Sequence, residues 1–351
     1  MTIAVYTNLK SYKIRNPDLY FIKSFLENLS TYYPEHNYFL LLPHSIDEPV
    51  TKFDSVKNIS VRTTAGLLYN YRLTRKVSQA VQNIKADVLI SIDCIFKNKA
   101  NQLVLLTSLQ PSLGKQKLEK AKSIFVLSQH IKDTLNTQQN LGDKRIFVLH
   151  GGANNIFQPI DEEMKSIIKE KYTESREFFI YRGRIKEENN IVSLLKAFSL
   201  FKKRQKSSMK LLLMGQVFWQ GNDFEKLIST YKYRDDVVLV TDEVPGQEAS
   251  ILATAYAMVQ PYTTNILFAF DAMQCGVPVL SIQNTTLQEI TNDGVLFFNA
   301  GNETDIAEKM MLIYKDELLR SQLIERGKNV VENYTWKKTV KTVSEAFTNQ
   351  I

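Results

Sequence analysis

Cations gather around a glycine in the segment "FFIYRGRIKEENN", directly after an apolar run that reads as a strand. Arg182, Arg184 and Lys186 stand around Gly183, and a helix is predicted to begin near Asn189. The free N–H groups and the dipole of a helix N-terminus attract negative charge, so this strand, loop and helix suit an anion such as phosphate. Two or three cations on such a loop are also common on ordinary solvated surfaces.

A second polar site is predicted in "VQPYTTNILFAFDAMQCGVP". A buried strand ends there, Thr263 or Thr264 suits a helix N-cap, and Gly276 ends the helix that follows. The N-terminus of this helix would direct backbone donors at a ligand. Asp271 lies in the middle of the helix, and a lone carboxylate there is more often solvated or paired than in contact with a ligand.

Short apolar runs alternate with helical patterns along all 351 residues, which exceed the usual size of one hydrophobic core. Several runs are apolar on both faces, which indicates parallel sheets covered by helices. A segment rich in Gly, Asn and Pro interrupts the pattern at 150–163. We therefore predict an α/β fold of two Rossmann-like doubly wound domains, 1–153 and 154–335, that face a central cleft, with a helix 336–351 crossing back over the first.

The composition, 44% hydrophobic and 23% charged, is that of an ordinary soluble protein. No run approaches the roughly 20 apolar residues of a membrane-spanning helix, and no signal peptide is evident, so we expect a cytoplasmic protein. The two cysteines and four histidines show no metal-ligand spacing. We expect neither a metal ion nor a cofactor.

Positive charge is concentrated in the front half of the chain. Residues 1–155 contain 20 Lys and Arg against 11 Asp and Glu, a balance of +9 within the total of +7. The stretches "YRLTRK" and "KQKLEKAK" fit a solvated face, an acidic acceptor or the inner face of an anionic membrane. Aromatic residues do not alternate with these cations as they do in stacking platforms, so nucleic acid is not an expected partner.

Taken in order, these stretches resemble the retaining glycosyltransferases of family 4, also called group 1, which have the GT-B fold. The resemblance covers nearly the whole chain and is strongest from about 146 to 336. In the second half it rests on "IYRGRIKEENNIVSLLKAF", "LLLMG", "DAMQCGVPVLSIQNTTLQEI", "GVLFFNAGNETDIAEKM" and "ENYTWKKTV". In the first half it rests on "SIFVLSQHIKDTL" and "RIFVLHGGANNIFQP".

The resemblance implies a hexosyltransferase-type reaction that moves a sugar from a nucleotide-diphosphate sugar to an acceptor hydroxyl, with retention at the anomeric carbon. The acceptor would be a glycan or a lipid-linked molecule in surface polysaccharide or glycolipid assembly. Without a metal ion, Arg, Lys and helix N-termini must neutralise the departing diphosphate. By position, this catalytic role falls to Arg184 and Lys186.

The resemblance also implies the contacts of the donor. Asp271 would accept hydrogen bonds from the ribose hydroxyls, backbone N–H groups near Asn265–Leu267 would face phosphate, and Glu289 would cap or orient its helix. The donor-binding positions are Gly183, Asn189, Thr263, Asn265, Ile266, Leu267, Asp271, Thr285 and Glu289.

This chain departs from the family pattern at several of these positions. Asn189 stands where a lysine is usual, Thr263 replaces the first of two glutamates, and Asp271 replaces the second. On the acceptor side Ser108 stands where a histidine is frequent, and the loop "KSYKIRNPDL" contains no glycine. These losses weaken leaving-group stabilisation. They leave open a non-catalytic GT-B protein that binds a partner glycosyltransferase, a glycan or a nucleotide, and a different two-Rossmann ligand binder.

Overall fold

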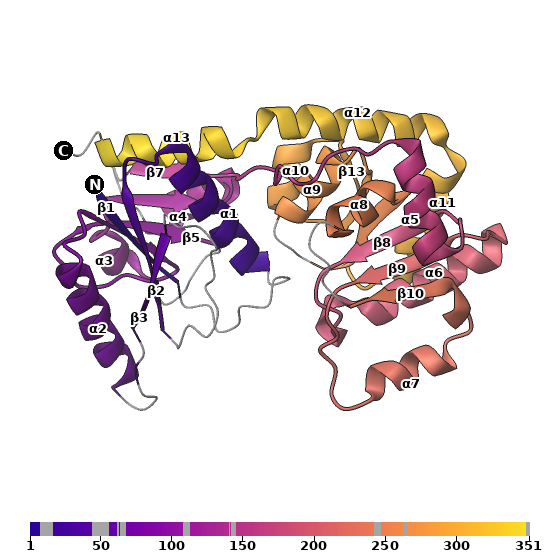
Figure 1. The fold of residues 1–351 in the computed structure, drawn as a ribbon, viewed down its shortest axis with the longest axis horizontal. Coiled ribbons are helices and arrows are strands. Elements are labelled where there is room, and N and C mark those ends of the chain that lie inside the picture. Colours follow the sequence, from indigo (N-terminus) through magenta and orange to yellow (C-terminus); the bar gives the residue numbers. More distant parts are fainter. Residues whose placement is uncertain are drawn as a thin grey trace. The chain divides into compact units, whose positions relative to one another are not determined.

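The computed structural model describes residues 1–7, 17–43, 56–61, 63, 68–107, 113–139, 141, 145–241, 247–262 and 266–348. The chain divides into two compact units (Figure 1). The first unit runs to Gly151 and takes up the chain again from Thr335. The second unit consists mainly of Gly152–Tyr334.

The described part of the first unit contains a seven-stranded parallel sheet in the order β3-β2-β1-β4-β5-β6-β7. The strands are β1 Thr2–Tyr6, β2 Asn37–Leu42, β3 Val56–Ser60, β4 Val88–Ile92, β5 Asn101–Leu106, β6 Ser123–Val126 and β7 Arg145–Val148. The helices are α1 Pro17–Tyr32, α2 Tyr69–Asn83, α3 Lys115–Leu118, α4 Gln129–Gln139 and α13 Trp336–Thr348.

The C-terminal helix α13 belongs to this first unit. The ring of Trp336 lies 5.5 Å from that of Phe21 on α1, and Thr339 Oγ1 donates a hydrogen bond to the carbonyl of Gly151 at 3.1 Å. Val340 and Val343 are buried beside them. The helix therefore completes the hydrophobic core of the unit that contains the N-terminus.

The second unit contains a six-stranded parallel sheet in the order β10-β9-β8-β11-β12-β13, counted over its described residues. Its strands are β8 Phe178–Arg182, β9 Lys210–Met214, β10 Val237–Val240, β11 Ala257–Gln260, β12 Val279–Ile282 and β13 Val295–Phe298. Its helices are α5 Glu162–Thr173, α6 Ile191–Gln205, α7 Asp223–Thr230, α8 Gln247–Thr254, α9 Leu267–Gln274, α10 Thr285–Thr291, α11 Glu303–Lys315 and α12 Glu317–Asn333, with 3₁₀ turns η1 Glu187–Asn189 and η2 Arg234–Asp236.

The sheet of the second unit is covered on both faces, because right-handed crossovers to the two sides of β8 place their helices on opposite faces. Helices α6 and α11 share one core with side chains of β8, β9 and β11, in which the rings of Phe179 and Phe201 meet edge to face at 5.2 Å. Helix α9 packs with α12. The predicted α/β class and the two doubly wound parallel sheets are confirmed.

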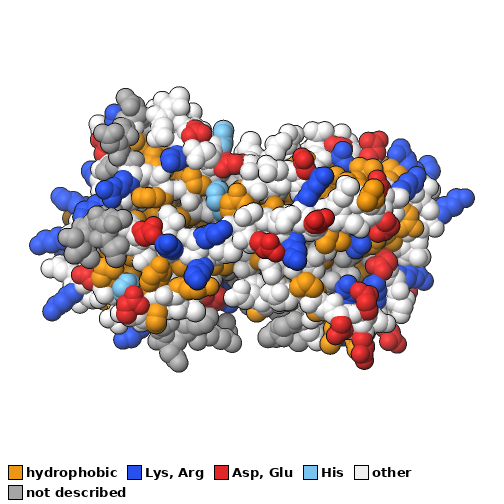
Figure 2. All heavy atoms as spheres, turned by 90° about the horizontal axis from the view of Figure 1, so that it is seen from above, with side chains coloured by type: hydrophobic (Ala, Val, Ile, Leu, Met, Phe, Trp, Pro, Cys, Tyr) orange, Lys and Arg blue, Asp and Glu red, His pale blue; other side chains and the backbone are white. Residues whose placement is uncertain are grey.

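The surface of the first unit is the more basic in the view of Figure 2. Blue Lys and Arg side chains spread over its part of the face, at the left, with fewer red carboxylates, whereas the two colours mix over the second unit. The exposed lysines of α13, Lys337, Lys338 and Lys341, add to this charge. No helix among the described residues is long and apolar enough to cross a bilayer.

Candidate functional site

The candidate site of the second unit lies where the strand order of its sheet reverses. From β8 the chain passes through α6 to β9 on one side, and from β11 it passes through α9 to β12 on the other. In parallel sheets ligands collect at the carboxyl ends of strands beside such a switch point. The loops that leave β8, β11 and β12 therefore form one edge, and they are the three segments in which the sequence analysis placed donor contacts.

Two glycines let the loops after β8 and β9 touch through their backbones. Gly183 has a φ of +144°, and a Cβ atom added to it would overlap the hydroxyl of Tyr262. A Cβ atom added to Gly215 would overlap the carbonyl oxygen of Gly183, whose own N–H donates to Met214 O at 3.0 Å. The backbone from which the next residue, Arg184, projects is therefore fixed by close packing.

The carbonyl of Arg184 is held by two donors. Tyr181 Oη donates to it at 2.6 Å and Asn189 Nδ2 at 2.7 Å, and Asn189 Nδ2 also lies 3.2 Å from Tyr181 Oη. Burial raises the pKa of Tyr181 well above its ordinary value, so its hydroxyl remains a donor at alkaline as well as neutral pH. Asn189 is only 5% exposed, so its amide orients the Arg184 loop rather than offering itself to a ligand.

The side chain of Arg184 is half-buried. Its guanidinium carbon lies 5.2 Å from the ring centroid of Phe218, and its Nε is buried with no hydrogen-bond partner among the described residues. Lys186 is also half-buried, and its Nζ lies 3.8 Å from a carboxylate oxygen of the exposed Glu188. An exposed ion pair of this length is weak, so both cations remain able to meet an anion.

Asn190 joins the loop after β8 to the end of β11. Its φ of +57° is in the left-handed region that asparagine tolerates, and its Nδ2 donates to Pro261 O at 2.7 Å. Gln260, at the end of β11, donates from Nε2 to the carbonyl of Arg182 at 3.1 Å, and its Oε1 is buried without a partner among the described residues. The structure thus brings the cationic loop and the segment before α9 together.

Arg182 makes a buried ion-pair cluster beneath this edge. Its side chain is 3% exposed, with Nε 2.6 Å from Glu248 Oε1 and Nη1 2.7 Å from Asp271 Oδ2. The guanidinium carbon lies 4.6 Å from the ring centroid of Phe157 and 4.4 Å from that of Phe268. One cation therefore links α8 and α9 to the end of β8, between two aromatic rings.

The structure gives Asp271 a different role from the ribose contact expected for it. The residue is 0% exposed, and its Oδ1 accepts a hydrogen bond from the backbone N–H of Asn154 at 3.0 Å while Oδ2 faces Arg182. A carboxylate enclosed in this way offers no accessible surface to a sugar hydroxyl. The ordinary interpretation of a mid-helix carboxylate, a paired residue, describes Asp271 better. The neighbouring thiol of Cys275 has its pKa raised to about 12 by burial, with the Asp271 charge adding to the shift.

Helix α9 begins with two buried side chains. Ile266 stands at its N-cap position without a capping side-chain hydrogen bond, and both Ile266 and Leu267 are buried. Contacts of these two residues with a ligand are therefore confined to their backbones. Three other expected site residues, Thr263, Asn265 and Ser108, lie outside the described residues.

Helix α10 presents its first turn at the same edge. Thr285 and Glu289 are both exposed, which leaves their side chains accessible. The helix is capped by Asn284, whose Oδ1 accepts the N–H of Leu287 at 3.0 Å. The capping role expected for Glu289 is therefore carried by Asn284, because an N-cap side chain must precede the first turn.

Sequence reasoning missed the carboxylate partner Glu248 and the supporting amides of Asn190 and Gln260. One signal was present for the cluster: Arg182 ends the apolar run "FFIYR", and an arginine buried at the end of a strand requires carboxylate partners. Nothing in the spacing identified Glu248, which lies 66 positions further along the chain.

Comparison with known proteins agrees with this architecture. The family model described as "Glycosyl transferases group 1" matches residues 163–330. The O-antigen chain mannosyltransferase B of Escherichia coli is 23% identical over 234 residues, which are 65% of this chain and 61% of the relative. More than a third of the length of that relative therefore lies outside the match with this chain.

Two solved structures share the fold over nearly the whole chain. Sucrose-phosphate synthase from Thermosynechococcus elongatus has a TM-score of 0.80 at 16% identity, covering 99% of this chain and 98% of that one. HepE of Anabaena, in complex with UDP and glucose, has a TM-score of 0.75 at 13% identity, covering 99% and 100%. At these identities the likeness concerns the fold. The chain therefore has the GT-B fold, and residues 163–330 of its second unit match the group 1 glycosyltransferases.

Proposed function

We propose that this chain is a retaining, hexosyltransferase-type glycosyltransferase that moves a sugar from a nucleotide-diphosphate sugar to an acceptor hydroxyl. The observation that carries this proposal is the switch-point edge, where Arg184 and Lys186 stand on a rigid loop that Asn190 joins to the segment before α9. The UDP and glucose bound by the Anabaena structure and the mannosyl transfer named for the E. coli relative support the substrate class.

The chemistry follows from the charge that must be neutralised. When the bond between the sugar and the diphosphate breaks, negative charge grows on the departing phosphate oxygens. The Arg184 guanidinium can donate two parallel hydrogen bonds to them, and Lys186 adds a second positive charge. The first-turn backbone of α9 contributes the positive end of its dipole. We propose that these groups act without a metal ion or a further cofactor.

A panel of UDP-, GDP- and ADP-sugars tests the proposal, with release of the nucleoside diphosphate and the melting temperature of the chain as readouts. We expect one base class to raise the melting temperature and to be turned over slowly, with or without EDTA. Stabilisation without turnover would favour the non-catalytic alternative, in which the chain binds a nucleotide or a partner protein. The absence of any stabilisation would reject donor binding altogether.

For the acceptor we propose a glycan or lipid-linked molecule of surface polysaccharide or glycolipid assembly, reached from the cytoplasmic face of an anionic membrane. The O-antigen role named for the E. coli relative and the tip of α2 support this. Leu68 and Tyr71 are 57% and 67% exposed there, next to the exposed Arg72, Arg75 and Lys76. Apolar and aromatic side chains among cations fit the interface of an anionic bilayer.

Vesicle co-sedimentation checks the docking surface. We expect the chain to bind vesicles that contain phosphatidylserine or phosphatidylglycerol at low salt, and binding to fall several-fold at raised salt. The variant Arg75→Gln/Lys76→Gln should bind roughly 30-fold more weakly, at about 1 kcal/mol per cation removed. The matched variant Lys203→Gln/Arg204→Gln, from the exposed end of α6 in the second unit, should bind normally. Equal loss in both variants would show only a general charge effect.

A further inference from the structure

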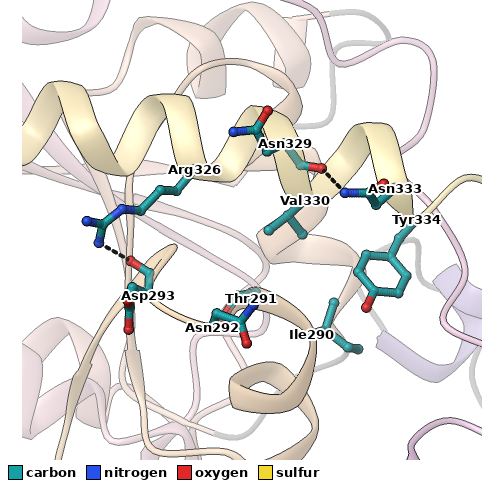
Figure 3. Close-up of a pocket in the computed structure, with 9 residues that line it drawn as sticks. All are labelled: Ile290, Thr291, Asn292, Asp293, Arg326, Asn329, Val330, Asn333 and Tyr334. Atoms are coloured by element: carbon teal, nitrogen blue, oxygen red, sulfur yellow. Dashed lines mark hydrogen bonds between the residues drawn. The ribbon is translucent and has the colours of Figure 1, made fainter.

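A pocket of about 400 Å³ opens between α12 and the turn after α10, within the second unit (Figure 3). Its volume is in the range of small-ligand pockets, about 300 to 1,000 Å³. The floor is formed by the buried side chains of Ile290, Thr291 and Val330. Exposed polar residues surround it, among them Asn292 and Asn329.

This pocket is separate from the donor edge. It adjoins the C-terminal end of α10, whereas Thr285 and the capping Asn284 stand at the N-terminal end. The seven residues of α10 span about 10 Å along the helix axis. A ligand in the pocket would therefore contact residues that the proposed transfer reaction does not use.

The charges around the pocket balance. Arg326 projects from α12 toward the turn and donates from Nη1 to the backbone carbonyl of Asp293 at 3.2 Å (Figure 3). Asp293 contributes one negative charge and Arg326 one positive charge, and no other lining residue is ionised at neutral pH. A strongly charged ligand gains little from such a site, which favours a neutral one.

The polar groups match a ligand with hydroxyls. The side-chain amides of Asn292 and Asn329 have no hydrogen-bond partner within the described residues, and each can donate and accept. Tyr334 lines one end, its ring stacked on Phe270 at 6.0 Å and 14°. An aromatic ring and an apolar floor next to amides suit a sugar, which has C–H faces and hydroxyl edges.

Asn292 occupies a strained backbone conformation, which lowers the stability of the folded chain. Its φ and ψ are 47° and −114°, and the N–H of Gly294 donates to Thr291 O at 2.8 Å, which closes a turn around Asn292 and Asp293. The first central position of such a type II′ turn favours glycine. A residue with a side chain in this strained conformation points to a use for that side chain in the pocket.

We propose that this pocket binds a neutral carbohydrate of one or two sugar units, independently of the donor. Its amides would bond the hydroxyls, and Val330 and Tyr334 would cover an apolar sugar face. Such a subsite can hold a glycan while the donor edge is empty, so the proposal does not depend on turnover.

The test is binding of defined disaccharides to the full chain without nucleotide, measured by saturation-transfer NMR and calorimetry. The probes are maltose, cellobiose and α-1,3-mannobiose, with glucose 6-phosphate as the charged comparison. We expect at least one neutral disaccharide to bind the wild-type chain, and more tightly than glucose 6-phosphate. Absence of binding for all three, or preference for the phosphate, overturns the proposal.

Two variants assign that binding to the pocket. Asn329→Trp fills the pocket, and Asn292→Gly removes an amide while relieving the turn, so it should raise the melting temperature by about 2 °C. Both should weaken disaccharide binding at least tenfold and leave nucleotide-sugar stabilisation unchanged. The control Gln322→Ala removes an exposed amide of α12 outside the pocket and should bind normally. Wild-type affinity in Asn292→Gly would place the sugar elsewhere and reject the pocket.

Discussion

Replacing Arg182 with methionine is expected to lower the free energy of unfolding of the second unit by about 3 to 5 kcal/mol, the usual cost of breaking a buried ion pair. The substitution leaves Asp271, 0% exposed, without its guanidinium partner, and removes the contacts with Phe157 and Phe268. Glu248 suffers less because it is 21% exposed and reaches water. Most of the lost stability therefore arises because the buried carboxylate of Asp271 no longer has a partner, and less of it arises from the missing contacts of the arginine.

A double-mutant cycle separates these causes. Asp271→Asn should be destabilising alone, yet Arg182→Met/Asp271→Asn should cost clearly less than the sum of the two single changes, because no unpaired charge remains on Asp271. Arg176→Ala is the surface control: its two ion pairs span 3.6 and 3.7 Å on a 41% exposed side chain, and the expected cost is below about 1 kcal/mol. Additive effects of Arg182 and Asp271 would contradict the buried pair.

The two tryptophans make this measurement specific to one unit. Trp219 lies in the second unit and Trp336 in the first, so urea unfolding in a Trp336→Phe background reports through Trp219. In many proteins with two compact units, the units unfold in separate transitions. A signal from the whole chain would then combine the free energies of unfolding of both units. All variants of the cycle should therefore be compared in that background.

The architecture was predictable because its signals are local. Strands such as "FFIYR" and "LLLMG" are short apolar runs, the helix expected to begin near Asn189 begins at Ile191, and the helix expected to end at Gly276 ends at Gln274. The spacing of apolar residues in a helix or a strand involves only residues close together in the sequence. It can therefore be recognised without knowledge of the fold. The family resemblance agreed with the same elements.

The roles of individual side chains were less predictable, because they depend on partners distant in sequence. Asp271 was assigned to a ribose by its place in a motif, but Arg182, 89 positions earlier, is buried against it. Asn189 stands where the family has a lysine, and the hydroxyl of Tyr181 on β8 explains its buried amide. The comparison with the family pattern therefore shows only that the lysine charge is missing at position 189. The packing of the folded chain is needed to show what Asn189 does instead.

Replacing Arg184 with alanine is expected to reduce turnover of the nucleotide sugar by about 100- to 1,000-fold, the range for removing one donor that stabilises developing charge. Nucleotide-sugar affinity should fall by about 1.5 to 3 kcal/mol, because a charge-assisted hydrogen bond is lost. Folding should be little affected: the loop is held through the backbone carbonyl of Arg184, by Tyr181 and Asn189, and that carbonyl survives the substitution.

Comparison of three variants tests this role against a general loss of charge. Arg184→Lys keeps the charge but not the paired geometry of a guanidinium, so it should recover part of the affinity and less of the turnover. Arg204→Ala, at the exposed end of α6, removes the same charge away from the switch-point edge and should match the wild type. Initial rates across donor concentrations separate the effects on kcat and KM. If Arg184→Ala bound and turned over the donor like Arg204→Ala, the phosphate would have to be held elsewhere on the edge, with Lys186 as the remaining cation of that loop.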